Sequence, residues 1–147
     1  MFKHILVPTD GSQFSQDTAK KAVALAKETG ARITAFYAKR EASEIYWDKM
    51  SWVTLPDQAK LDDAAERDAQ KILGYIEDLC KNAGVSCAKV SATCNSIYKG
   101  IIDAASTSNC DLIFMASHGR RGIDALLLGS ETHKVLTHSK IPVLVYR

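Results

Sequence analysis

Short apolar runs alternate along the whole chain with longer segments in which apolar residues recur at helical spacing. The short runs are rich in branched and aromatic residues and predict strands at 2–7, 31–38, 85–93, 112–115 and 143–146. The longer segments predict amphipathic helices at 13–29, 61–80, 97–105 and 130–138. Strands that alternate with helices form βαβ units with right-handed crossovers. The pattern therefore predicts an α/β, Rossmann-like fold with a single open five-stranded parallel sheet and helices on both faces.

Two details of this pattern give sharper expectations. Asn95 precedes the helix predicted at 97–105, and its side chain is expected to cap the amino terminus of that helix. The last strand, Val143–Tyr146, is apolar and is expected at an edge of the sheet. Open backbone groups at such an edge favour pairing with a second copy of the chain.

The segment 39–58 fits neither pattern. It contains both tryptophans, Trp47 and Trp52, on a connection that is longer than most. One interpretation is an insertion that packs its aromatic side chains on the surface of the domain. The other is a flap over a ligand or a partner surface, because aromatic residues on long connections often serve binding.

Length and charge narrow the function classes. The 147 residues fit one domain that covers 1–147. The 19 basic and 17 acidic residues leave a net charge of +2, which is too small to indicate a nucleic-acid partner. No apolar run is long enough to span a bilayer, and the first one is too short for a signal peptide. We therefore expect a cytoplasmic protein with no nucleic-acid and no membrane partner.

The cysteines support the same location. The chain has four of them, without the closely paired spacing of a zinc site: Cys80, Cys87, Cys94 and Cys110. We expect free, buried thiols in a reducing compartment and no bound metal.

Candidate chemistry lies in two loops that follow predicted strands, 8–12 and 116–132. In an open parallel sheet, ligands bind beyond the carboxyl ends of the strands. Three glycines in the second loop are expected to adopt left-handed conformations and to let a ligand approach closely: Gly119, Gly122 and Gly129. Directly after them, the hydroxyls of Ser130 and Thr132 and the first free amides of a helix are expected to face an anion. Glycines and Gly-Ser helix starts also occur at strand ends that bind no phosphate, so the chemistry alone leaves both interpretations open.

The second loop resembles the nucleotide signature of the universal stress protein family. That signature is a glycine, two residues, a second glycine, nine residues, and a third glycine followed by serine or threonine. Gly119, Gly129 and Ser130 match it, whereas Ala116 replaces the first glycine. The segments 4–12 and 141–147 resemble the first and last strands of the same family. The resemblance implies the adenine nucleotide alpha hydrolase-like fold and the branch of the family that binds ATP.

Roles of single residues follow from the resemblance. It implies that Pro8, Thr9 and Asp10 border the adenosine, that Ala38 contacts the adenine, and that Met115 and Ala116 line the base and ribose. It implies a phosphate site formed by Gly119, Arg120, Gly129, Ser130, Glu131 and Thr132. Glu131 would repel phosphate unless it turns away or shares a divalent cation. ATP, or ADP or AMP, with Mg²⁺ as an accompanying ion, is the implied ligand, and a homodimer through Val143–Tyr146 is the implied assembly.

Catalysis is not the expected role. The chain lacks a nucleophile elbow and the lysine-containing Walker loop, so at most slow ATP hydrolysis is expected. As a histidine, His118 is the residue type most often used as a general base, but a histidine beside a glycine turn is more often a loop residue that bonds the backbone. A phosphoacceptor domain would need more acidic residues after the first strand than Asp10, and an aspartate where Asn95 stands.

The sequence thus predicts a nucleotide-dependent regulatory protein of the stress response. The alternative is a dimeric interaction protein that does not require nucleotide and acts through its dimer surface or the Trp47/Trp52 segment.

Overall fold

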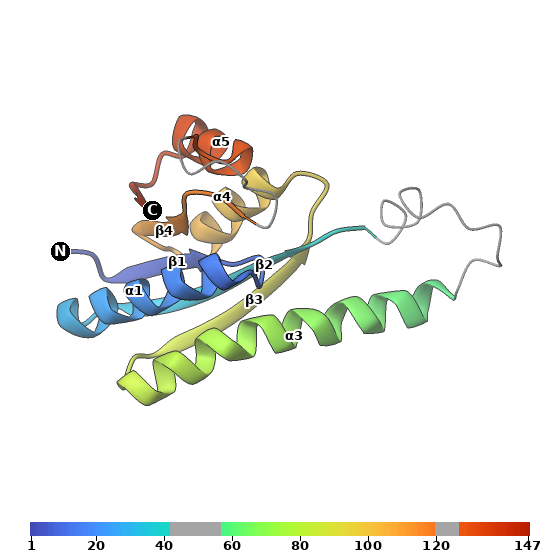
Figure 1. Ribbon diagram of the computed structural model, residues 1–147, viewed down its shortest axis with the longest axis horizontal. Helices are drawn as coiled ribbons and strands as arrows, with labels where there is room; N and C mark the ends of the chain where they lie inside the picture. Colours follow the sequence, from blue (N-terminus) through green and yellow to red (C-terminus); the bar gives the residue numbers. More distant parts are fainter. Residues whose placement is uncertain (42–56, 120–126) are drawn as a thin grey trace.

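A computed structural model describes residues 1–41, 57–119 and 127–147 of the chain. Five strands form one parallel sheet in the order β3-β2-β1-β4-β5 (Figure 1). The strands are β1 (His4–Pro8), β2 (Arg32–Lys39), β3 (Cys87–Thr93), β4 (Leu112–Ala116) and β5 (Val143–Tyr146). The predicted α/β class and the five-stranded parallel sheet are confirmed, and β5 lies at an edge as expected.

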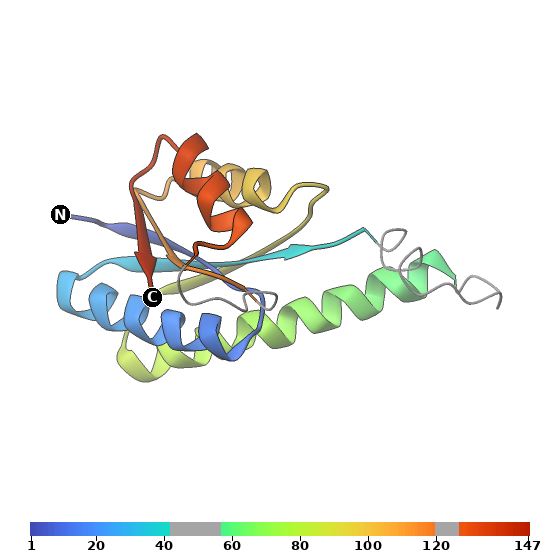
Figure 2. The same cartoon turned by 45° about the horizontal axis from the view of Figure 1, so that its top comes forward.

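The described helices cover both faces of the sheet. They are α1 (Gln13–Thr29), α3 (Gln58–Ala83), α4 (Ile97–Thr107) and α5 (Ser130–His138). Figures 1 and 2 both show α1 and α3 on one face and α4 and α5 on the other. Each face has its own apolar cluster, because successive residues of β1 point to opposite faces: Ile5 and Val7 belong to one cluster and Leu6 to the other. The central strand is therefore buried on both sides.

Helix α3 begins at Gln58, three residues before the expected start at residue 61. Asp57 caps it, since the Asp57 side chain accepts a hydrogen bond from the Ala59 amide at 3.2 Å. Of the segment 39–58, Lys39 is part of β2 and Gln58 part of α3. Trp47 and Trp52 lie outside the described residues, so the two interpretations of that segment stay predictions.

The prediction that Asn95 caps α4 is wrong. Ser96 occupies the cap position and makes no side-chain cap hydrogen bond. The Tyr98 amide in the first turn donates instead to Glu131 Oε2, at 2.9 Å. The acceptor thus comes from the neighbouring helix α5, and the helix start shifts to where that carboxylate reaches it.

All four cysteines are free, as expected, but only two are buried. Cys80 and Cys110 lie in the core, and burial raises the pKa of the Cys110 thiol to about 11. Cys87 and Cys94 are half-buried. Within the described ranges, no cluster of three or more acidic, histidine or cysteine side chains suited to a metal was found. None of the described helices has the length and apolar character needed to cross a membrane.

Candidate functional site

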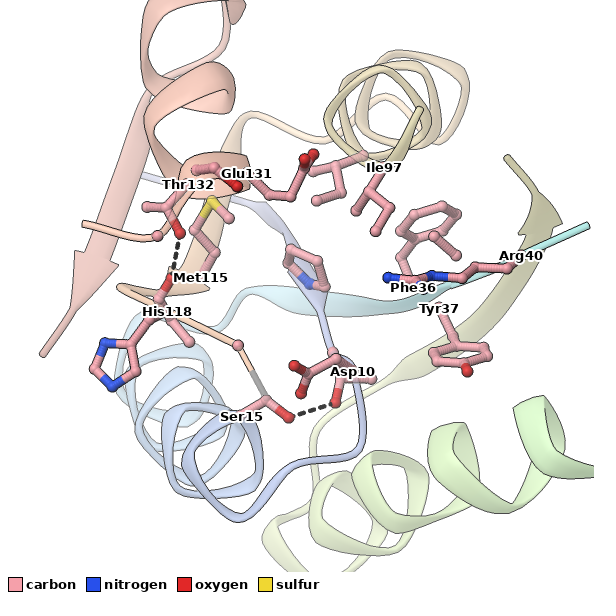
Figure 3. A pocket seen from close by; sticks show the side chains of 18 of the residues that line it. Asp10, Ser15, Phe36, Tyr37, Arg40, Ile97, Met115, His118, Glu131 and Thr132 are labelled. Carbon is pink, nitrogen blue, oxygen red and sulfur yellow. Dashed lines mark hydrogen bonds between the residues drawn. The ribbon is translucent and has the colours of Figure 1, made fainter. Parts of the chain in front are cut away.

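The sheet reverses its strand order between β1 and β4. From β1 the chain builds outward to β2 and β3 on one side, and β4 and β5 follow on the other. Connections diverge at such a switch point and leave a crevice beyond the carboxyl ends of the strands. A cavity of about 660 Å³ lies there, between the ends of β1, β2 and β4 and the first turns of α4 and α5 (Figure 3).

The predicted site residues that the structure describes all line this cavity. They are Pro8, Thr9, Asp10, Ala38, Met115, Ala116, Gly119, Gly129, Ser130, Glu131 and Thr132. Arg120 lies outside the described residues. The sequence therefore located one continuous concave surface, although the residues come from segments more than a hundred positions apart.

The loop after β1 is held by its own side chains. Thr9 Oγ1 accepts a hydrogen bond from the Gly11 amide at 3.1 Å and lies 2.9 Å from Ser15 Oγ. Asp10 Oδ1 accepts from the Ser12 amide at 2.9 Å. Gly11 has a φ of 77°, a left-handed conformation that glycine adopts without strain. These bonds fix the orientation of the Asp10 carboxylate, which Figure 3 shows at the cavity wall.

The glycines of the second loop have a different role from the one expected. Neither Gly119 nor Gly129 has a positive φ, so the prediction of left-handed conformations is wrong for both, and Gly122 lies outside the described residues. What both positions require is space. A Cβ at Gly119 would lie 2.5 Å from Asp10 Oδ2, and one at Gly129 would lie 3.1 Å from the Cα of His118.

Hydrogen bonds tie this loop to α5 and to the edge strand. The Gly129 amide donates to the Ser117 carbonyl at 2.8 Å, and the Ser117 amide donates to the Tyr146 carbonyl at 2.8 Å. Thr132 Oγ1 donates to the Ala116 carbonyl at 2.9 Å, and Thr132 is buried. Its hydroxyl hydrogen is therefore used inside the protein and does not face a ligand as a donor, contrary to expectation.

The amides of Ser130, Glu131 and Thr132 remain as donors in the first turn of α5. No carbonyl or side chain among the described residues accepts from them. A helix amino terminus has this property because its first amides have no intrahelical partner. Together with the partial positive charge of the helix end, they form a surface suited to an anion.

Glu131 turns away from these amides. Its Oε2 accepts from the Tyr98 amide, and its Oε1 lies 3.2 Å from Lys134 Nζ. Figure 3 shows the side chain directed toward α4 and Ile97. Of the two ways to relieve the repulsion of phosphate, turning away is the one that the structure adopts.

His118 is fixed by packing. Its ring stacks on Phe14 of α1 at 4.4 Å between centroids and 7° between planes, and its Nδ1 is hydrogen-bonded to Ser117 Oγ at 2.9 Å. Figure 3 shows the imidazole turned from the middle of the cavity. The loop role favoured over general-base catalysis fits this geometry, although the partner is a side chain rather than the backbone.

One side of the cavity is lined by residues that were not predicted from the sequence. The additional lining residues come mainly from β2 and the helices: Ser15, Phe36, Tyr37, Lys39, Arg40, Ala65, Ile97, Ile101 and His118. Lys39 Nζ forms an ion pair with Glu66 of α3, and that hydrogen bond holds the pKa of Glu66 below its usual value. The strict alternation of β2 was the signal that could have found Phe36 and Arg40, since both share a face with Ala38.

The family model of the universal stress proteins matches residues 1–147. The chain belongs to the universal stress protein family. A family member from Bacillus subtilis is 30% identical over 149 residues, and the match covers 100% of both chains. Another from Methanocaldococcus jannaschii is 28% identical over 155 residues, covering 100% of this chain and 83% of the relative.

Solved structures share the fold. A hypothetical protein studied as a test case of structural genomics has a TM-score of 0.81 at 23% identity, with 99% of this chain and 95% of that chain covered. A universal stress protein in complex with cAMP has a TM-score of 0.73 at 22% identity, with 99% and 97% covered. One from Archaeoglobus fulgidus, in complex with dAMP, has a TM-score of 0.70 at 16% identity, with 99% and 98% covered. The fold is therefore the adenine nucleotide alpha hydrolase-like fold of this family.

Proposed function

We propose that this protein binds an adenine nucleotide in the cavity at the switch point, with ATP as the main ligand and ADP or AMP as its alternatives. The observation that carries the proposal is the pairing of two surfaces in one cavity. Three amides of α5 that find no acceptor in the described part of the chain lie on one side, and apolar side chains of β2 and α4 lie on the other. A nucleotide has the matching polarity, with an anionic and a flat aromatic end. The volume of about 660 Å³ is in the usual range of small-molecule sites.

The lining residues divide between the parts of the ligand. As the resemblance implies, Ala38 contacts the base, Pro8 and Thr9 border the adenosine, and Met115 and Ala116 line the base and ribose. Asp10 accepts hydrogen bonds from the base or the ribose. The phosphates bind the amides of Ser130, Glu131 and Thr132, beside Gly119 and Gly129, with Arg120 as a further contact. cAMP and dAMP in structural relatives support this choice of ligand class.

Mg²⁺ enters with the phosphates in this proposal. The Glu131 carboxylate bonds the Tyr98 amide and Lys134 and is not available as a ligand for the ion. We therefore place no Mg²⁺ on Glu131 and assign the binding of the phosphates to the amides of α5. Affinity for AMP that is independent of Mg²⁺ would support this assignment.

Binding rather than turnover is the proposed role. His118 is held by Phe14 and Ser117 and turned from the cavity, so it is poorly placed to activate a water molecule beside the phosphates. Hydrolysis is at most slow, and the bound nucleotide acts as a signal in the stress response. The free cysteines support a reducing compartment, the cytoplasm.

We propose that the protein transmits this signal as a homodimer that forms through β5. This strand lies at the sheet edge, and Leu144 in its middle is 37% exposed. Light scattering should give a dimer for the native chain and a monomer for Leu144→Lys, because a lysine at an edge opposes strand pairing. The exposed Leu144 also favours the second candidate, a dimeric interaction protein that does not require nucleotide.

One experiment separates the two candidates. The small molecules that copurify with the protein are identified by mass spectrometry, and ATP, ADP and AMP are titrated calorimetrically with and without Mg²⁺. Nucleotide at a hundred times its Kd should also stabilise the fold by about 2.7 kcal/mol and raise the melting temperature. A protein that copurifies with no nucleotide and binds none at millimolar concentration would be the interaction protein.

A further inference from the structure

Arg40 reaches into the cavity from the side opposite α5. Figure 3 shows its guanidinium group on the side of Phe36 and Ile97, whereas Thr132 and His118 lie across the cavity. The anion-binding amides belong to the same first turn of α5 as Thr132. Arg40 is thus a cation placed away from the phosphate surface.

The strand explains this placement. Phe36 and Ala38 pack in the apolar cluster under α4 and α5, whereas Tyr37 packs in the cluster under α1 and α3. Lys39 also points to α3, where it pairs with Glu66. The Cys94 amide donates to the Lys39 carbonyl at 2.9 Å and fixes the backbone up to that residue. Because successive side chains alternate, Arg40 continues the face of Phe36 and Ala38.

The charge of Arg40 is not neutralised by the part of the chain that the structure describes. Lys39 is paired with Glu66, and Glu131 is paired with Lys134, but no described carboxylate forms an ion pair with Arg40. A guanidinium group is planar and weakly hydrated, and it stacks on aromatic rings. A flat aromatic ligand beside Phe36 and Ile97 would give the guanidinium group of Arg40 a ring on which to stack.

We propose that Arg40 is a specificity-determining residue that stacks on the base of the bound nucleotide. This inference rests on the proposed function, since it takes the phosphates to lie at α5. It adds that the cavity selects its ligand by an aromatic base at the β2 side, and that the base contributes affinity independently of the number of phosphates.

Calorimetry of Arg40→Ala with three probes tests the inference. Adenosine has the base without phosphate, inorganic tripolyphosphate has the anion without the base, and ATP has both. Loss of a cation–π contact should weaken adenosine and ATP by the same factor, roughly 3- to 30-fold, and leave tripolyphosphate unchanged. Arg32→Ala, an exposed arginine at the other end of β2, is the matched control and should bind all three probes as the native chain does.

The outcomes are distinct. Equal affinity of Arg40→Ala and the native chain for adenosine would overturn the inference and leave the proposed function intact. So would a loss confined to tripolyphosphate and ATP, because it assigns the effect to charge at the phosphates. A native chain that binds neither ATP nor adenosine would overturn the proposed function itself. Melting curves of the variants should coincide, since Arg40 is exposed.

Discussion

The amino and carboxyl ends of the same sheet differ in what happens to their polar groups. At the amino end most of them satisfy one another: Asp111 accepts from the amides of Lys3 at 2.8 Å and His4 at 3.0 Å, and His4 Nε2 bonds Thr34 Oγ1 at 2.7 Å. His4 Nδ1 is the exception, since it is buried without a hydrogen-bond partner among the described residues. At the carboxyl end, the amides of α5 and the guanidinium of Arg40 have no such partners among the described residues. The amino end is closed by internal bonds that stabilise the fold, whereas the open polar groups of the carboxyl end are those that we propose bind a ligand.

The largest expected effect comes from closing the open end. Gly129→Val should lower nucleotide affinity more than 100-fold, or about 3 kcal/mol, because the new side chain forces the start of α5 away from Ser117 and His118. Its Cβ would meet the backbone of Ser117 and His118 at 3.3 and 3.1 Å. Calorimetry with ATP measures the loss.

A matched glycine tests whether that loss is specific to the site. A Cβ at Gly74 in α3 would meet nothing within 4 Å. Gly74→Ala should therefore keep full affinity and raise the stability by about 0.5–1 kcal/mol through helix propensity. If Gly129→Val binds ATP as tightly as Gly74→Ala does, the amide surface of α5 is not the phosphate site.

The second effect concerns the closed end. Asp111→Ala removes the acceptor of two backbone amides and should cost about 2 kcal/mol of unfolding free energy, measured by urea denaturation. Nucleotide affinity should not change, since Asp111 lies at the far end of the strands. Asp63→Ala, at an exposed position of α3, is the control and should be neutral. A comparable loss of affinity in Asp111→Ala would show that the two ends are coupled.

Lowering the pH should reduce the unfolding free energy through groups at the amino end of the sheet. Burial, with the positive charge of Arg32 as a second cause, lowers the pKa of His4 from its ordinary value of 6.5. The unfolded chain therefore binds a proton first, and stability that is complete above pH 6.5 decreases as the pH falls toward the lower folded value. Burial alone would raise the pKa of Asp111, but hydrogen bonds from His4 and Lys3 outweigh it and lower that pKa, which adds a second loss at more acidic pH.

Denaturation at pH 7, 6 and 5 measures this slope for the native chain and for His4→Gln, which cannot titrate there. The slope should be reduced in His4→Gln. An unchanged slope would mean that another group controls the acid response. This effect is smaller than that of Asp111→Ala, because a single group with one neutral hydrogen bond is involved.

Features that depend on local sequence could be predicted, whereas contacts between distant segments could not. Apolar periodicity identified the strands and helices, and the parallel topology placed the loops after β1 and β4 side by side, because these consequences depend on local pattern and general rules. The cap of α4 was missed because its acceptor is Glu131, which is 33 residues from Tyr98 in the chain and meets it only in the folded structure. Local reasoning favoured Asn95 because it could see only neighbours in sequence.

The candidate site divides in the same way. The signature found Gly119 and Gly129, but their role as space for Asp10 and His118 depends on contacts between loops that only the structure gives. Arg40 belongs to no sequence motif that would have indicated a site. The role proposed for it follows from the face of β2 that it continues and from its place in the lining of the cavity.

The smallest expected effect is at Glu131. Its carboxylate is hydrogen-bonded within the protein, like the groups at the amino end, but it borders the amides of α5 proposed to bind phosphate. Glu131→Gln keeps an acceptor for the Tyr98 amide and loses the charge that pairs with Lys134. Stability should fall by about 0.5 kcal/mol, since the pair is partly exposed. Affinity for ATP should rise about two- to threefold at low salt and less for AMP, because a negative charge near the phosphates is removed.

Glu77→Gln, which loses a similar pair with Lys89, should not change affinity. A decrease of ATP affinity in Glu131→Gln would mean that the carboxylate contacts the ligand or its Mg²⁺ directly, and the separation between internal and ligand bonds would not hold at this residue.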